Sequence, residues 1–152
     1  MRKFERVAEW AIEYGAHDVE LPRRATKSAA GYDFFCPTKI VIAPGEMKKI
    51  STNIKALMNS DEVLILCARS SFAAKFIYLP NAIGVIDSDF YGNESNDGNM
   101  SFTIANRGDK PFTFEKGDKL GQGFFIKYLV TDDDIGTQEK RKGGFGSTGK
   151  AF

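Results

Sequence analysis

The sequence predicts an all-β fold, either a barrel or a sandwich, because short apolar segments of strand length recur along most of the chain. Turn-forming residues separate these segments, as at Pro44 and Gly45 or at Gly117 and Asp118. Strands do not alternate with long helical segments, so a doubly wound parallel sheet is not expected. The chain has 152 residues, of which 42% are hydrophobic, and this is enough for one domain with a core.

The predicted strands are rich in β-branched and aromatic residues. They are residues 18–21, 32–35, 39–42, 47–54, 63–68, 77–79, 83–86, 99–106, 112–114 and 121–129. Apolar residues at helical spacing predict a helix in residues 4–14, with a first strand as the alternative. Residues 71–76 are expected to form one short helix.

Composition excludes several classes of protein. The net charge is only +1, from 21 basic and 20 acidic residues, so neither a nucleic acid nor a membrane is expected as a partner. No apolar segment approaches the ~20 residues of a membrane span, and the N-terminus has no signal-peptide pattern. Cys36 and Cys67 do not suggest a disulfide framework, and Cys67 is expected to be a buried thiol. A cytoplasmic location, or the host cytoplasm for a viral protein, is therefore expected.

Residues 131–152 differ in composition from the rest of the chain. They contain few aliphatic side chains, three consecutive aspartates at 132–134 and the glycine-rich tract GGFGSTG at 143–149. This composition predicts a mobile C-terminal arm that follows a single β-barrel domain in residues 1–130.

Three groups of residues suggest a ligand that carries phosphates. Arg69, followed by Ser70 and Ser71, combines a guanidinium with hydroxyl groups. The tract GGFGSTG offers unhindered backbone N–H groups and hydroxyls. Asp87 and Asp89 follow an apolar strand and are expected to point to the same side, where one could act as a base. A helix cap, a flexible linker and a surface turn, respectively, are the ordinary alternatives.

Five segments, taken in order, resemble the five motifs of the trimeric dUTPase family. They are residues 30–34 (AGYDF), 68–73 (ARSSFA), 81–92 (NAIGVIDSDFYG), 116–122 (KGDKLGQ) and 143–149 (GGFGSTG). The resemblance implies a distorted β-barrel of the jelly-roll kind, with one short helix and a flexible C-terminal arm. Residues 1–18 would then be a variable N-terminal extension, and residues 93–99 an insertion that lengthens a hairpin turn.

The activity that this resemblance implies is hydrolysis of dUTP to dUMP and diphosphate, which keeps uracil out of DNA and supplies dUMP for thymidylate synthesis. Asp87 matches the general base that activates a water for in-line attack on the α-phosphorus. Mg2+ would bind across the phosphates, and Asp33 would contact it through a metal-bound water.

Other matched positions would contact the substrate. Those near the phosphates are Arg69, Ser70, Ser71, Gln122, Arg141, Gly146, Ser147 and Thr148. Those near the uracil are Asn81, Gly84, Val85 and Ile86, in a β-hairpin slot, and Phe145, which would stack on the base. Phe90 stands where the family usually has tyrosine, and its ring would pack under the deoxyribose and leave no room for a 2′-hydroxyl. Lys140 is the alternative to Arg141 as the basic residue of the arm.

The resemblance also implies a homotrimer in which each active site uses residues of three chains. Two alternative functions stay open. The chain could be a relative of dCTP deaminase on the same fold, although residues 86–90 (IDSDF) and the glycine-rich tract favour dUTPase. It could also be a regulatory binding protein that engages a protein partner according to its nucleotide state, through residues 93–99 or the N-terminal extension.

Overall fold

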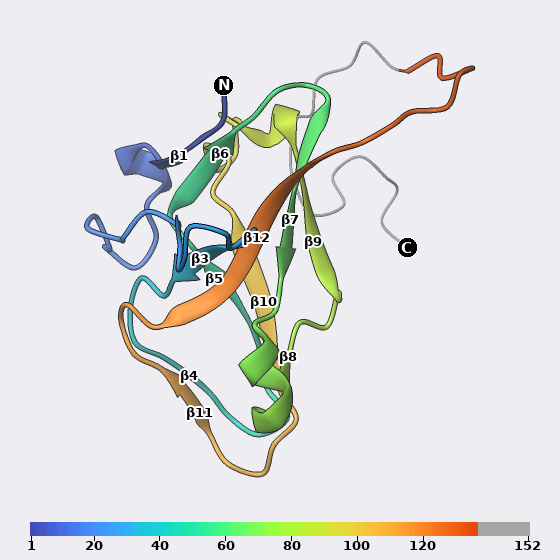
Figure 1. The fold of residues 1–152 in the computed structure, drawn as a ribbon. Helices are drawn as coiled ribbons and strands as arrows, with labels where there is room; N and C mark the ends of the chain where they lie inside the picture. The colour runs from blue at the N-terminus through green and yellow to red at the C-terminus, as the bar shows by residue number, and fades with distance from the viewer. Residues whose placement is uncertain (137–152) are drawn as a thin grey trace.

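The computed structural model describes residues 1–136, whose strands form four antiparallel sheets (Figure 1). The largest sheet has the strand order β2-β3-β12-β7-β9. Its strands are β2 (Arg23–Arg24), β3 (Tyr32–Phe35), β7 (Glu62–Cys67), β9 (Ile83–Asp87) and β12 (Lys119–Lys127). Strand β12 is central, because it pairs with both β3 and β7.

Three smaller sheets complete the described fold. They are β5 (Met47–Ser51), β10 (Ser101–Asn106) and β8 (Ile77–Tyr78) in one, β1 (Lys3–Arg6) and β6 (Ile54–Leu57) in the next, and β4 (Ile40–Ile42) and β11 (Phe112–Phe114) in the last. Short 3-10 helices occur at η1 (Glu9–Ala11), η2 (Ser70–Lys75) and η3 (Ser88–Phe90). The all-β prediction and the short helix after β7 are therefore confirmed. Within residues 1–136, no helix has the length and apolar character needed to cross a membrane.

The core lies on the inner face of the five-stranded sheet, and the alternation of the two faces is clear in the second half of β7. On β7, Leu64 and Leu66 are fully buried, whereas Ile65 and Cys67 on the opposite face are partly exposed. Cys36, rather than Cys67, is the fully buried cysteine, because Cys67 has the outward parity of its strand. The alternation of side chains along β7 thus decides which of its residues face the core.

Two glycines on β12 leave room for buried side chains on the inner face of the large sheet, and Gly121 allows the sheet to approach β10. A Cβ atom on Gly121 would lie 2.3 Å from Cε1 of Phe102, a fully buried residue of β10. A Cβ atom on Gly123 would lie 2.9 Å from Cδ2 of Leu66. The ring of Phe102 packs edge-on against Phe34 of β3, with the ring centroids 5.5 Å apart. The inner face of β12 therefore needs residues without side chains where these groups fill the space.

The prediction of a helix in residues 4–14 is wrong, and the alternative of a first strand is correct. Strand β1 pairs with β6, and only η1 is helical. The ring of Phe4 packs against Tyr32, Phe34 and Phe125 of the large sheet. This aromatic contact and the strand pairing outweigh the weak helical preference of the segment.

Residues 47–54 form two strands in different sheets, not one. The chain turns at Asn53, whose φ of 59° is left-handed, a conformation that asparagine tolerates better than most residues. The Asn53 side chain supports the turn by donating to the carbonyls of Glu13 and Ala16, at 2.9 and 3.2 Å. Residues 18–21 form no strand.

The prediction that residues 93–99 lengthen a hairpin turn is wrong, because they connect strands of two different sheets. They follow β9 and η3 and lead into β10, which pairs with β5 and β8. Asn93, Asp97 and Asn99 are buried in this loop. The loop is thus part of the packed structure and not a surface extension.

Substitution of Gly121 by alanine should lower the free energy of unfolding by about 1–3 kcal/mol, because the added methyl group forces the Phe102 ring out of its position. Urea unfolding, followed by circular dichroism, measures this loss. In the double variant Gly121→Ala/Phe102→Leu the smaller side chain relieves the contact, so the total loss should be less than the sum of the two single losses. Additive losses would show that the two side chains do not collide.

Candidate functional site

One row of residues crosses the large sheet and joins three of the motif segments. Asp33, Gln122, Cys67 and Ile83 lie directly opposite one another on β3, β12, β7 and β9. Residues that are directly opposed in antiparallel strands project to the same face, so these four side chains share the outer face of the sheet.

Gln122 holds these segments together through its side chain. Its Nε2 donates a hydrogen bond to the carbonyl of Ala68, at 3.2 Å, immediately before Arg69. Its Oε1 lies so close to Gly31 that a Cβ atom there would be 2.7 Å away. The glycine at position 31 therefore makes room for the glutamine amide, and the pair fixes where the second motif segment leaves the sheet.

Asp33 forms an ion pair with Lys119 on the same face. The Lys119 Nζ lies 2.7 Å from Asp33 Oδ2, and the carboxylate side chain is only 14% exposed. A bulge in β12 between Lys119 and Gly121 shifts the register by one residue and lets the lysine reach across. Within residues 1–136, no group of three or more His, Cys, Asp or Glu side chains could hold a metal ion.

Arg69, Ser70 and Ser71 lie at the beginning of η2, next to this row. Arg69 is the N-cap residue, and its carbonyl accepts a hydrogen bond from the N–H of Phe72, at 3.0 Å. Phe72 is buried and packs against Phe112 and Phe114, so it anchors the helix to the core. Ser70 and Ser71 are exposed beside this anchor, where their hydroxyls can meet a ligand.

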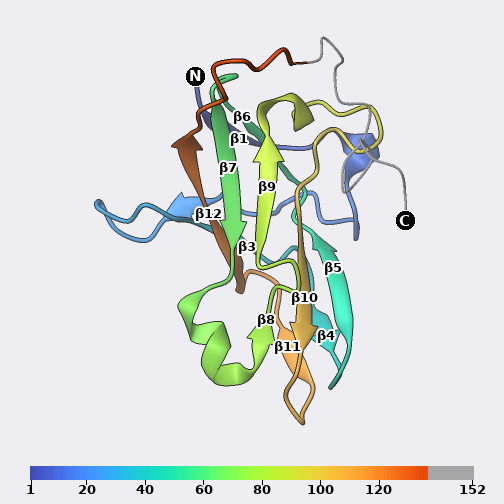
Figure 2. The same ribbon diagram turned by 90° about the vertical axis from the view of Figure 1, so that its right-hand side faces the viewer.

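Asp87 lies at the other end of the sheet. It ends β9 opposite Val63, whereas Ile83 of the same strand is in the row with Gln122. Four residues of extended chain separate Asp87 from that row, which corresponds to ~13 Å along the strand. Figure 2 shows the same separation, since η2 follows β7 at one end and η3 follows β9 at the other.

The residues around Asp87 also differ from their expected arrangement. The extended chain ends at Asp87, and Asp89 lies in η3, so the two carboxylates do not alternate along one strand. Phe90 is only 5% exposed and belongs to the hydrophobic core. Any contact of Phe90 with a ligand would therefore use one edge of its ring.

The segment with Asn81, Gly84, Val85 and Ile86 is a turn followed by β9, not a two-stranded hairpin, because β8 pairs with β10 and β9 with β7. The Asn81 Nδ2 donates to the carbonyl of Ile83 at 2.9 Å and stabilises this turn. Strand β9 is at the edge of the sheet, so one side of its backbone is open. Gly84 lies against Leu66, and a Cβ atom added to the glycine would be 3.1 Å from the Leu66 Cβ.

Comparison with known proteins identifies the family. A family model described as dUTPase matches residues 17–149. This chain belongs to the dUTPase family. It is 41% identical to the deoxyuridine 5′-triphosphate nucleotidohydrolase of Lactococcus lactis over 143 residues, which cover 93% of this chain and 95% of the relative. The corresponding protein of Actinobacillus pleuropneumoniae serotype 3 is 32% identical over 142 residues, covering 88% and 90% of the two chains.

Solved structures agree with this assignment. The crystal structure of the dUTPase from Streptococcus mutans has a TM-score of 0.75 and 35% identity, over 85% of this chain and 98% of that chain. A mutant of the dUTPase from phage phi11 of S. aureus, which coordinates a structural Mg(II) ion, has a TM-score of 0.67 over 91% and 97% of the two chains. Its identity of 20% supports the fold alone.

The dUTPase motifs therefore fall into three groups in this chain. The first and fourth meet in the Gln122 row and the second begins beside it at Ala68, whereas the third runs from Ile83 in that row to Asp87 at the far end of the sheet. The fifth, with Arg141, Phe145, Gly146, Ser147 and Thr148, lies outside the described residues, as do most of residues 131–152.

Sequence reasoning missed Lys119 and the carbonyl of Ala68. Lys119 lies inside the fourth motif segment, and its charge opposite to that of Asp33 was the available signal. The pairing could not be read from the sequence, because it depends on the bulge that brings Lys119 beside Asp33.

Substitution of Lys119 by methionine should lower the free energy of unfolding by about 1 kcal/mol, since it leaves the Asp33 carboxylate in a poorly solvated position without its cation. Lys39→Met is the matched control, because Lys39 and Glu115 are 3.2 Å apart but largely exposed. Its effect should stay below about 0.5 kcal/mol. Equal effects of the two substitutions in chemical denaturation would show that Asp33 is solvated like a surface carboxylate.

Proposed function

We propose that this protein hydrolyses dUTP to dUMP and diphosphate, and so keeps uracil out of DNA and supplies dUMP for thymidylate synthesis. The observation that carries the proposal is the contact of Gly31, Gln122 and Ala68, which joins three motif segments of a dUTPase beside Arg69. Asp87 and the glycine-rich tract complete the set of motifs in the sequence.

Asp87 is the proposed general base. It takes a proton from a water molecule, which attacks the α-phosphorus in line with the leaving diphosphate. Little covalent work is required of the protein, so the reaction depends on the position of the water and on cationic groups around the phosphates. Arg69, Ser70, Ser71 and Gln122 are proposed to bind the triphosphate, since Ser70 and Ser71 are exposed beside the Gln122 row.

Uracil is proposed to bind at the open edge of β9. Because backbone groups alternate in direction along a paired strand, alternate residues within Gly84, Val85 and Ile86 direct their N–H and C=O away from β7, where they could pair with the edge of the base. The Asn81 side chain keeps the preceding turn in place through Ile83. A slot that fits the C5–H edge of uracil rejects the methyl group of thymine, and mismatched donors and acceptors reject cytosine.

The residues present fit a Mg2+ ion that is held mainly by the substrate. The described chain offers no cluster of metal-binding side chains, and Mg2+ commonly takes its contacts from phosphate oxygens and waters. Asp33 has Oδ2 paired with Lys119, so Oδ1 is the oxygen proposed to accept from a metal-bound water. The bound ion would neutralise charge on the phosphates.

A homotrimer is proposed, because Asp87 and the Gln122 row of the same chain lie at opposite ends of the sheet. The outer face of the large sheet carries partly exposed apolar residues between these two ends, with Ile83, Val85 and Ile126 at 47%, 57% and 43% exposure. Packing of a second chain would cover such residues and could bring its Asp87 to Arg69 and Gln122 of the first. The arm with Arg141, Phe145, Gly146, Ser147 and Thr148 would close the site from a third chain.

The direct test is diphosphate release with Mg2+ and each deoxynucleoside triphosphate in turn. Release from dUTP, with at least about 100-fold lower kcat/KM for dTTP and dCTP, is expected from the pocket argument. Ammonia release from dCTP would instead identify a deaminase.

Asp87→Asn should reduce kcat by about 1000-fold or more, because the carboxylate that accepts the proton is lost. Binding of dUTP, followed by calorimetry, should change little, since Asp87 acts on the water and not on the substrate. An unchanged kcat would remove Asp87 from the role of base.

A further inference from the structure

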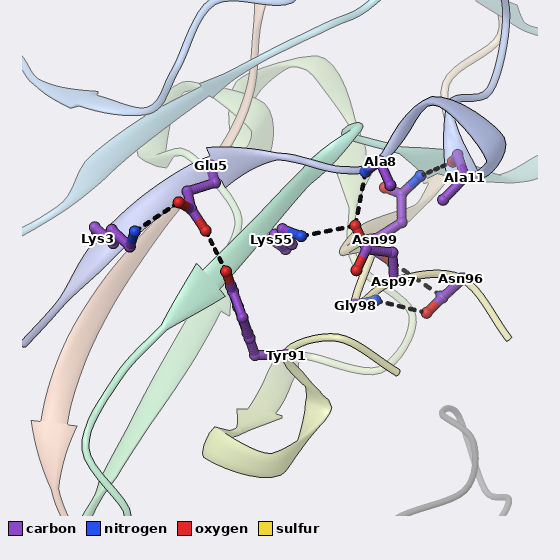
Figure 3. Close-up of polar contacts among 10 residues, drawn as sticks. All are labelled: Lys3, Glu5, Ala8, Ala11, Lys55, Tyr91, Asn96, Asp97, Gly98 and Asn99. Carbon is purple, nitrogen blue, oxygen red and sulfur yellow. Dashed lines mark hydrogen bonds and ion pairs between the residues drawn. The ribbon is translucent and has the colours of Figure 1, made fainter. Parts of the chain in front are cut away.

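The turn that follows Asp87 carries Tyr91 and is bordered by the N-terminal segment, residues 1–18, and by loop 93–99 (Figure 3). We refer to residues 87–92 as the Asp87 turn. It follows β9, which among residues 1–136 pairs with β7 at the edge of the sheet. Contacts from loop 93–99 and from the N-terminal segment add to the packing of Phe90 in the core.

Loop 93–99 packs directly on the backbone of the Asp87 turn. The N–H of Asn93 donates to the carbonyl of Phe90, at 3.2 Å. Gly98 has a φ of +80°, and a Cβ atom there would lie 2.6 Å from the Phe90 carbonyl oxygen and 3.2 Å from the Tyr91 Cα. This close approach is possible only for glycine.

The side chain of Tyr91 binds the N-terminal strand. Its hydroxyl donates a hydrogen bond to Glu5 Oε2, and Lys3 donates to Glu5 Oε1 at 2.6 Å. The Lys55 Nζ lies 4.9 Å from the centroid of the Tyr91 ring, within the range of a cation–π contact. The hydrogen bond to Glu5 raises the pKa of Tyr91 to about 12, so the phenol stays protonated and remains a donor near neutral pH.

Asp97 ties the loop to β6 through an ion pair and to the N-terminal segment through a hydrogen bond. The Lys55 Nζ lies 2.7 Å from Asp97 Oδ2, and both side chains are mostly buried. The same oxygen accepts a hydrogen bond from the N–H of Ala8, at 2.6 Å. Asn99 donates to the carbonyl of Ala11 at 3.0 Å, which adds a second link to the N-terminal segment.

We propose that Tyr91, held by Glu5, is a positioning residue that fixes the Asp87 turn, with loop 93–99 and the N-terminal segment as its support. The proposal rests on the proposed function of Asp87 as the base. A base must be held within about 0.5 Å of its productive place, and Tyr91, four residues after Asp87, ties the turn to β1 in addition to the packing of Phe90 in the core. The hydroxyl binds Glu5, so it would act on Asp87 through the backbone of the turn.

The test compares Tyr91→Phe with Tyr14→Phe. The first keeps the ring and its contact with Lys55 but loses the hydrogen bond to Glu5. The second loses a tyrosine hydrogen bond between the N-terminal segment and the N–H of Ser51, away from the Asp87 turn. Tyr91→Phe should lower kcat for dUTP by about tenfold or more, while the KM and the melting temperature change little. Tyr14→Phe should leave kcat within about twofold.

A double variant tests whether Tyr91 acts through Glu5. Because both single substitutions break the same bond, Tyr91→Phe/Glu5→Ala should lose no more kcat than the worse single variant. Independent, additive losses would overturn the proposed partnership. An unchanged kcat in Tyr91→Phe, or an equal loss in Tyr14→Phe, would overturn the positioning role.

Hydrogen exchange of the amides in residues 88–93 separates this inference from the proposed function. Exchange there should be faster in Tyr91→Phe than in Tyr14→Phe or the unsubstituted protein, whether or not the protein hydrolyses dUTP. Unchanged exchange would overturn the inference even in an active dUTPase. Lack of dUTP hydrolysis by the unsubstituted protein would contradict only the proposed function.

Discussion

The antiparallel register of β3, β12, β7 and β9 decides where the described site residues lie. It aligns Asp33, Gln122 and Ile83 in one row and leaves Asp87 four residues farther along β9. A shift of β12 by one residue relative to β3 and β7 would turn Gln122 toward the core, because side chains alternate between the two faces. The glycines on the inner face of β12 protect this register, since only one face of the strand can accept Phe102 and Leu66.

A second kind of interaction holds the parts that the sheet does not reach. The backbone of Asn53 donates to Asn99 Oδ1 at 2.9 Å, and the two side chains share a further hydrogen bond of 3.1 Å. These buried amides bind the N-terminal segment where β5 and β6 separate. Buried polar groups are costly when they lose a partner, so such a network specifies one arrangement more sharply than apolar packing does. Side-chain hydrogen bonds therefore join the N-terminal segment, the turn at Asn53 and loop 93–99.

Much of the fold could be read from the sequence, because the alternation of apolar residues reports directly on strands. The predicted strands in residues 32–35 and 112–114 coincide with β3 and β11. The helix in residues 4–14 was wrong, since the pairing of β1 with β6 is a contact between distant segments that a local pattern does not contain. The break at Asn53 was missed for the same reason, because its partners are Glu13 and Asn99.

The site was predictable as a set of residues but not as an arrangement. The motifs named Arg69, Gln122 and Asp87, but only the register reveals that Asp87 lies apart from the other two within one chain. Lys119 and Tyr91 escaped notice, because their roles depend on a bulge and on a strand from the N-terminus. Contacts that depend on tertiary placement leave little local signal.

In the proposed trimer, Asp87 of one chain works with Arg69 of another. The most direct measurement is the activity of mixed trimers, obtained by co-expression of Asp87→Asn with Arg69→Ala. If equal amounts of the two variant chains assemble at random, about a quarter of the sites should contain both an intact Asp87 and an intact Arg69. The mixture should then show about a quarter of the dUTP hydrolysis of the unsubstituted protein. Co-expression of Asp87→Asn with a chain that carries both substitutions should give inactive trimers, because no chain then supplies Asp87. No recovery in the first mixture, with mixed trimers demonstrated by mass, would contradict the account.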